Sequence, residues 1–293
     1  MLYDDLTTKF IEYMEDMERS PRTIELYKRD LRAIRRYLEE RLNGPVYMED
    51  ITPDDLEAFM HYVRNELKYS PNTRSNYFYT IRSFYTFAYK KDLVNRNISL
   101  SMDFMRMPKK ERNYLTEEEV EEILKNINSK LIHLIVTFLF NTGLRISECR
   151  NLKLEDVDLD ARTIHVIEGK GRKDRVVPIN DTLYVLLVDY VDNWREGNKS
   201  DLFFATKKTG SASYCYINST LKEAANKAGI HKQVSCHVLR HSFASALVKR
   251  NVNLVDIQKL LGHESLAVTS VYTHTNLDSL SRAVNALNNQ KGE

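Results

Sequence analysis

The sequence predicts a mostly α-helical protein with two domains and one small antiparallel sheet. Three observations carry this prediction. Helix-start signals recur through the first hundred residues, the segment 163–179 alternates around a glycine-rich turn as paired strands do, and the helical pattern is interrupted over residues 95–113. A chain of 293 residues is long enough for two ordinary domains.

The first domain has well-marked helix starts. Ser20-Pro21 and Ser70-Pro71 each place a capping hydroxyl before a proline at the first helical position. Thr52-Pro53 repeats this arrangement and is followed by two aspartates. These starts predict an all-helical N-terminal domain over residues 1–97, with helices at about 4–17, 21–41, 53–67 and 71–91.

Residues 98–113 are expected to form a linker, because periodicity fades there and Pro108 interrupts the chain. A second domain, 114–293, is expected to follow. Thr116 with Glu119 forms a capping box that predicts a helix over 117–126. An apolar segment predicts the next helix, over 130–141.

The segment 163–167 alternates and is rich in β-branched residues, 169–174 has the composition of a turn, and 175–179 returns as a second strand. Helical patterns then resume to the end of the chain. We expect these helices at about 181–195, 213–228, 237–250, 253–261, 265–273 and 277–288.

The composition is that of a folded protein, with 42% hydrophobic and 29% charged residues. The apolar run Leu131–Phe140 is too short to cross a bilayer. Three cysteines without a CxxC pair argue against a disulfide framework and a cysteine-rich zinc site, and favour a reducing cytoplasm. We therefore expect a cytoplasmic protein with no membrane partner.

Basic residues are concentrated in two segments although the net charge is only +2. Residues 20–41 hold seven basic and four acidic residues, and residues 64–96 hold seven and two. Such segregation is compatible with a polyanionic partner. Solvated helix faces are the alternative explanation.

Several polar residues of the second domain stand out. Arg145 follows a helix-ending glycine, and an ion pair with Glu148 is its structural alternative. Lys170 lies between two glycines at the tip of the predicted hairpin, either as a phosphate or groove contact or as part of a solvated basic turn, which is common. His237 and Arg240 share one face of a predicted helix, either as an anion site or as a structural pair.

His263 follows Gly262 at a predicted helix end, and Tyr272 comes nine residues later. With 17 tyrosines in the chain, a half-buried core tyrosine is the default interpretation. Each of these signals is weak alone. Their order is more informative: Arg145, Lys170, His237-x-x-Arg240, Gly262-His263 and Tyr272.

This order resembles the Arg–Lys–His-x-x-Arg–His–Tyr pattern of the tyrosine recombinase (phage integrase) family. Local contexts agree, such as Thr142-Gly-Leu-Arg-Ile-Ser-Glu148 and Leu260-Leu-Gly-His263. The resemblance covers nearly the whole chain and is greatest to compact Xer-type recombinases. It implies a core-binding (SAM-like) helical DNA-binding domain followed by a catalytic domain.

The resemblance also implies a reaction. Tyr272 would attack a DNA phosphodiester, Arg145 and Arg240 would hold its oxygens, and Lys170 would protonate the leaving 5′-oxygen. His237 and His263 would add hydrogen-bond donors, and Glu148 would orient a basic neighbour. The products would be a 3′-phosphotyrosine link and then a Holliday junction, with no cofactor and no metal.

Duplex DNA with paired recombination half-sites is the implied partner. The expected assembly is a homo-tetramer, or a hetero-tetramer with a related recombinase, joined through an exchange helix at 277–288; a role for an accessory protein stays open. The expected DNA contacts are the basic residues Arg22, Arg74, Arg82, Arg172, Lys173 and Arg175.

Two other functions remain open. A type IB topoisomerase-like enzyme would use the same phosphotyrosine chemistry to relax DNA, and a catalytically silent DNA-binding regulator would only bind. The compact first domain and the predicted exchange helix favour recombination. The sequence leaves open the DNA site and the choice among chromosome-dimer resolution, mobile-element integration or excision, and inversion.

Overall fold

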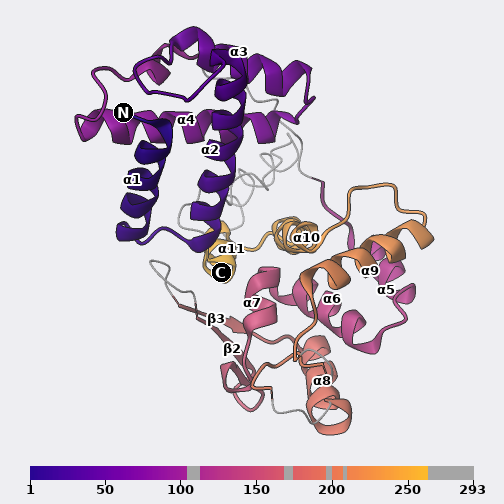
Figure 1. The fold of residues 1–293 in the computed structure, drawn as a ribbon. Coiled ribbons are helices and arrows are strands. Elements are labelled where there is room, and N and C mark those ends of the chain that lie inside the picture. Colours follow the sequence, from indigo (N-terminus) through magenta and orange to yellow (C-terminus); the bar gives the residue numbers. More distant parts are fainter. Residues whose placement is uncertain (104–112, 168–173, 196–199, 207–209, 263–293) are drawn as a thin grey trace, which may run out of the picture. The chain divides into compact units, whose positions relative to one another are not determined.

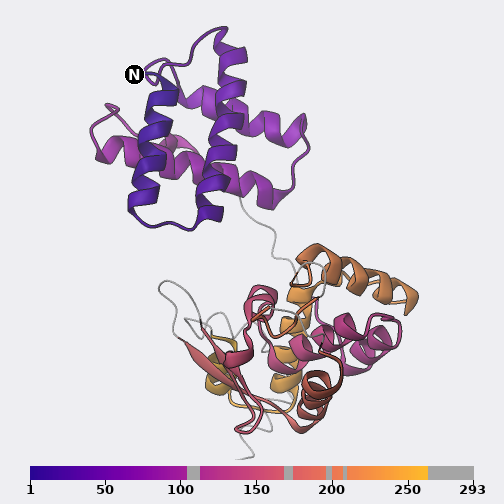
Figure 2. The ribbon, with the colours of Figure 1, turned by 60° about the horizontal axis from the view of Figure 1, so that its bottom comes forward.

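The computed structural model describes residues 1–103, 113–167, 174–195, 200–206 and 210–262. The chain divides into two compact units, Met1–Lys110 and Glu111–Glu293. The first is all-helical in its described part, and the second combines helices with a small sheet (Figures 1 and 2). This architecture confirms the predicted fold class.

Four α-helices build the first unit, close to the predicted ranges. They are α1 (Tyr3–Asp16), α2 (Pro21–Leu42), α3 (Pro53–Asn65) and α4 (Pro71–Lys90). The Ser20 and Ser70 side chains accept hydrogen bonds from the backbone N–H of Thr23 and Thr73, as the Ser-Pro starts predict. Helices α1 and α2 lie side by side in both ribbon views.

The core of the first unit is rich in aromatic rings. Phe10 and Phe84 meet edge to face with their ring centroids 5.5 Å apart, and both are almost fully buried. A short 3₁₀ helix, Ile98–Ser101, follows α4 and packs against the same core, in which Ile98 and Met102 are buried. These residues fall within the linker expected over 98–113, and its beginning, up to Met102, packs against the core of the first unit. The boundary between the domains stays a prediction.

The helices of the second unit follow the predicted order, except that α7 was not predicted. They are α5 (Glu117–Lys125), α6 (Lys130–Thr142), α7 (Ile146–Asn151), α8 (Asp181–Asp189), α9 (Tyr214–Lys227), α10 (Cys236–Lys249) and α11 (Leu254–Leu261). The Thr116–Glu119 capping box opens α5 as predicted. The predicted helix over 181–195 is confirmed as a helical segment, in which α8 continues into a π-helical turn at Tyr190–Trp194. The predicted helices 265–273 and 277–288 lie outside the described residues.

A three-stranded antiparallel sheet of β1 (Val157–Asp158), β2 (Thr163–Val166) and β3 (Arg175–Pro178) has the order β1-β2-β3. Ile164 pairs with Val177 and both side chains are buried, whereas Val166 pairs with Arg175 at the other end. Strand β1 was not predicted because two residues are too few to show an alternation. The register places Arg175 at the start of β3, beside the helices of the core.

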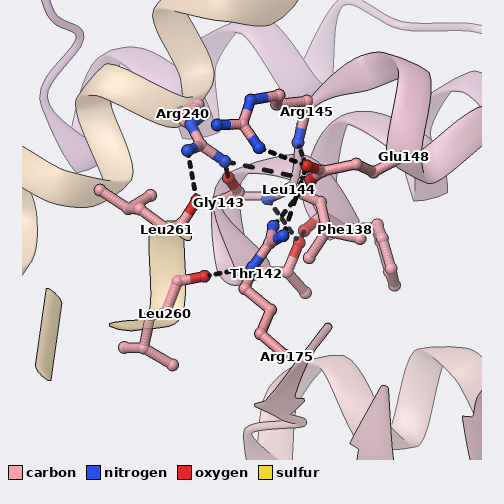
Figure 3. A network of polar contacts seen from close by, with 10 residues as sticks. All are labelled: Phe138, Thr142, Gly143, Leu144, Arg145, Glu148, Arg175, Arg240, Leu260 and Leu261. Atoms are coloured by element: carbon pink, nitrogen blue, oxygen red, sulfur yellow. Dashed lines mark hydrogen bonds and ion pairs between the residues drawn. The ribbon is translucent and has the colours of Figure 1, made fainter. Parts of the chain in front are cut away.

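Helix α6 carries the centre of the second core and packs against α10. Phe138 and Leu139 of α6 are fully buried, as is Leu239 of α10. The C-terminal end of α6, the beginning of α7, strand β3, α10 and the end of α11 converge beside this core (Figure 3). No helix among the described residues has the length and apolar character that a membrane span requires.

Replacing Phe84 with alanine is expected to lower the free energy of unfolding of the first unit by about 3–5 kcal/mol, because a buried ring leaves a cavity. Tyr89→Ala on the same helix is the matched control, since Tyr89 is half exposed and should cost about 0.5 kcal/mol or less. Urea unfolding followed by circular dichroism measures both. Equal losses for the two variants would contradict this account of the core.

Candidate active site

The junction between α6 and α7 places the first arginine of the site. Gly143 ends α6 in the left-handed conformation (φ 64°), and Arg145 precedes α7. The Glu148 carboxylate accepts a hydrogen bond from the Arg145 backbone N–H at 2.7 Å and another from Arg145 Nη1 at 2.6 Å. Glu148 therefore caps the start of α7 and holds the Arg145 side chain at the same time.

Strand β3 brings a second arginine to the same carboxylate. Arg175 Nη2 donates to Glu148 Oε2 at 2.7 Å, and Nη1 lies 3.4 Å from Oε1. Arg175 Nε donates to the backbone carbonyl of Leu260 at 2.9 Å. The Arg175 and Glu148 side chains are only 7% and 9% exposed, so this forked pair is largely removed from water.

Helix α10 supplies the third arginine, Arg240, which is nearly fully buried. Its Nη1 donates to the carbonyl of Gly143 at 2.8 Å and its Nη2 to the carbonyl of Leu261. Nη1 also lies 4.0 Å from Glu148 Oε2. Figure 3 shows the three guanidinium groups around Glu148, each from a different part of the chain.

The end of α11 closes the site from the other side. A helix leaves its last carbonyls without intrahelical partners, and here Arg175 and Arg240 bind those of Leu260 and Leu261. Gly262 then turns with φ 63°. A Cβ at Gly262 would lie 3.1 Å from Arg175 Nη1, so the arginine passes directly over the glycine.

The arrangement suits an anion. Arginine stays protonated in proteins, so the carboxylate that the three guanidinium groups share compensates only part of their charge. Arg145 is the most accessible of them, with a quarter of its side chain exposed. A phosphodiester could accept paired hydrogen bonds from such a group.

His237 lies on α10 one turn before Arg240, as predicted from their spacing. It is exposed, and its ring meets that of His241 edge to face with the centroids 4.5 Å apart. The described part of the predicted set, Arg145, His237, Arg240 and Glu148, thus comes from α7 and α10. Lys170, His263 and Tyr272 lie outside the described residues, as do Arg172 and Lys173.

Arg175 is the residue for which the structure corrects the interpretation of the sequence. It was expected to contact DNA with the other basic residues of the turn. Its guanidinium instead points into the protein and is bound by Glu148 and Leu260. Sequence alone cannot assign this pair, because the two residues are 27 positions apart and meet only when the sheet packs on α7.

The predicted DNA contacts of the first unit differ in accessibility. Arg22 is exposed in the first turn of α2. Arg82 donates to the carbonyl of Met102 at 3.1 Å and lies over the Phe78 ring, so its guanidinium is engaged within its own unit. Arg74 is partly buried, and its Nε has no hydrogen-bond partner among the described residues.

A basic pocket that was not predicted lies between α2 and the start of α4. It has a volume of about 370 Å³ and is lined by Arg29, Arg32, Ala33, Arg36, Tyr69, Thr73 and Tyr77. Arg32 and Arg36 are exposed there. The spacing of Arg29, Arg32 and Arg36 puts all three on one helix face, a signal that was available in the sequence.

Two cysteines border the site but are not available as nucleophiles. Cys149 follows Glu148 and Cys236 precedes His237, and both are buried. Burial raises the pKa of the Cys149 thiol well above its usual value and that of Cys236 to about 11, so both stay protonated at neutral pH. No group of three or more metal-ligating side chains occurs in the described part of the chain.

Comparisons with family models and with individual proteins indicate the same family for this chain. The phage integrase family matches residues 113–278, and the phage integrase SAM-like domain matches residues 5–103. Tyrosine recombinase XerC of Halalkalibacterium halodurans is 35% identical over 94% of this chain and 95% of its own. Tyrosine recombinase XerC of Oceanobacillus iheyensis is 32% identical over 94% and 92%.

Among solved structures, XerH site-specific recombinase bound to its difH substrate in a pre-cleavage complex aligns with a TM-score of 0.70. It is 26% identical to this chain, and the alignment covers 89% of this chain and 78% of that one. The similarity therefore extends over both units of the chain.

We expect Gly262→Ala to destabilise the second unit more than Gly229→Ala does. Both glycines have positive φ, so both substitutions carry the roughly 1 kcal/mol cost of a left-handed alanine. Only the Cβ at Gly262 would press on Arg175, whereas nothing lies within 4 Å of a Cβ at Gly229. Urea unfolding of the two variants measures the difference, and an equal cost would contradict the close approach of Arg175.

Proposed function

The chain belongs to the phage integrase family, and on this basis we propose that it is a site-specific tyrosine recombinase that cuts and rejoins duplex DNA. The observation that carries the proposal is the assembly of Arg145 and Arg240 around Glu148 from distant segments. These are two of the basic positions in the ordered set that the sequence presents. Their convergence supports a single phosphate site.

In the proposed reaction, Arg145 and Arg240 bind the non-bridging oxygens of the scissile phosphate and stabilise the charge that develops on them. Such preorganised donors typically contribute a few kcal/mol each. The backbone carbonyls of Gly143 and Leu261 fix the plane of the Arg240 guanidinium, which reduces the reorganisation needed when the phosphate arrives. The exposed ring of His237 can add a donor beside them.

Tyr272 is proposed as the nucleophile. Its phenolic oxygen forms a bond to phosphorus, the bond from phosphorus to the 5′-oxygen breaks, and Lys170 donates a proton to that oxygen. A phenol has an ordinary pKa near 10, so nearby cations and a histidine base, His237 or His263, must help to remove its proton. The resulting 3′-phosphotyrosine keeps the energy of the ester, and a 5′-hydroxyl of the partner strand reverses the step.

The basic pocket of the first unit is proposed to bind the DNA backbone. Arg32 and Arg36 are exposed on α2 and face an opening that also holds the Thr73 hydroxyl. Each phosphate neutralised by an arginine releases counterions, so binding should weaken steeply as salt rises. Arg22 at the beginning of the same helix would extend this surface.

By analogy with the Xer relatives, we propose that four subunits, identical or paired with a related recombinase, bind two recombination sites, each made of two paired half-sites. The structures of XerH with difH DNA, and the names of the XerC and XerD relatives, support a DNA substrate of this kind. An exchange helix at 277–288 would join the subunits. The proposal includes a cytoplasmic location.

Covalent capture tests the proposal directly. The protein is incubated with sheared DNA of its source, denatured and digested, and the DNA that stays attached to peptide is sequenced. We expect wild type to retain a narrow set of sequences and Tyr272→Phe to retain none, because the variant lacks the nucleophilic oxygen. Tyr216→Phe is the matched control, since Tyr216 is an exposed tyrosine on α9.

The other outcomes are informative. Diffuse capture through Tyr272 would indicate a topoisomerase-like activity without a fixed site. Equal capture by wild type and Tyr272→Phe would contradict the assigned nucleophile. Absence of capture with intact, salt-sensitive DNA binding would favour a silent binder.

Replacing Arg36 with alanine is expected to weaken binding to a random-sequence duplex and to reduce the slope of log K against log salt by about one, because one phosphate contact is lost. Arg35→Ala removes the same charge but is the control, since Arg35 pairs with Asp4 and Glu39. Fluorescence anisotropy at several salt concentrations measures both slopes. A change of equal size in the two variants would contradict the role of the pocket.

A further inference from the structure

Arg175 is bound by several groups within the second unit. It joins three elements that are separate in sequence: β3, which carries it, α7 through Glu148, and α11 through Leu260. A residue that only contacted DNA would be exposed, yet only 7% of this side chain is accessible. Its contacts are therefore those of a connector between elements.

From these contacts, and resting on the proposed recombinase function, we propose that Arg175 is a positioning residue for strand cleavage. It acts through Glu148 on Arg145. The two Nη groups of Arg175 bind the two oxygens of the Glu148 carboxylate, and the Arg145 side chain and backbone N–H donate to the same two oxygens. Fixing Glu148 from behind thus fixes the direction of the Arg145 guanidinium.

The Arg175 side chain also fixes the C-terminal end of α11. Its Nε binds the carbonyl of Leu260 while Arg240 binds the next carbonyl, that of Leu261. Cations near a helix C-terminus are favoured because the last carbonyls carry partial negative charge. The absence of a side chain at Gly262 leaves the space that Arg175 occupies. The Arg175 side chain therefore fixes the position of Arg145, through Glu148, relative to the C-terminal end of α11.

The test compares Arg175→Met and Arg175→Lys with Arg162→Met. Methionine keeps the apolar stem and removes the charge, and lysine keeps the charge but cannot bind Glu148 through a fork and Leu260 at once. Arg162 is a suitable control because it precedes β2, is half exposed, and pairs with Asp181. Arg145 and Arg240 remain beside Glu148 in every variant, so the carboxylate keeps cationic partners and each variant is expected to fold.

The first readout is the rate of covalent adduct formation at saturating sheared DNA, with DNA affinity measured separately on a random-sequence duplex. A displacement of about 1 Å in a catalytic group can cost about a hundredfold in rate. We expect Arg175→Met to cleave about 10- to 100-fold more slowly, Arg175→Lys to fall between it and wild type, and Arg162→Met to match wild type. Affinity and salt slope should stay unchanged in all three.

Two results of this readout would overturn the proposal. Equal cleavage rates for Arg175→Met and Arg162→Met would show that Glu148 positions Arg145 without help. A salt slope that falls by about one in Arg175→Met would show a phosphate contact instead.

The second readout does not depend on activity. The guanidinium signals of the arginines are observed by NMR on protein labelled with nitrogen-15. The signal of Arg145 is assigned because it is lost in Arg145→Lys. We expect this signal to broaden in Arg175→Met and to stay sharp in Arg162→Met. If wild type forms no adduct, the proposed function fails, and an unchanged Arg145 signal would independently overturn the positioning role.

Discussion

The carboxylate of Glu148 is the constraint on which the proposed site depends. Three guanidinium groups would repel one another if they were brought together in a poorly hydrated place without a counter-charge. Glu148 lies among Arg145, Arg175 and Arg240, and it also caps the start of α7. The same two oxygens thus hold a helix, a strand and a second helix around one point. Removing Glu148 would leave the arginines without their counter-charge, which costs more than the ion pairs themselves contribute.

Backbone carbonyls at two helix ends also compensate the charge of the arginines. Gly143 and Gly262 both end helices in the left-handed conformation, and neither position has room for a Cβ: at Gly143 it would overlap the Phe243 ring, and at Gly262 it would press on Arg175. The carbonyls beside these turns, of Gly143, Leu260 and Leu261, accept hydrogen bonds from the buried arginines. Backbone dipoles therefore share the compensation of charge with Glu148. The two glycines are needed for space as much as for their dihedral angles.

Much of this arrangement was accessible from the sequence, because local signals decide local structure. Capping side chains such as Ser20 and Thr116 mark helix starts by hydrogen bonds within a few residues, and the alternation at 163–166 reflects a sheet with one buried face. The π-helical form of the turn after α8 and the two-residue strand β1 escaped prediction because neither leaves a recognisable local pattern in the sequence. The inward direction of Arg175 escaped it for the same reason, because charge alone does not distinguish a ligand contact from an internal pair.

The guanidinium cluster contains residues that are synthesised at different stages of translation. Arg145 and Glu148 emerge from the ribosome early in the second unit, but the carbonyls that hold Arg175 and Arg240 belong to Leu260 and Leu261. A nascent chain that stops before α11 thus has the three arginines and Glu148 but lacks two of the carbonyls that bind Arg175 and Arg240. The complete cluster can therefore form only after α11 has been synthesised.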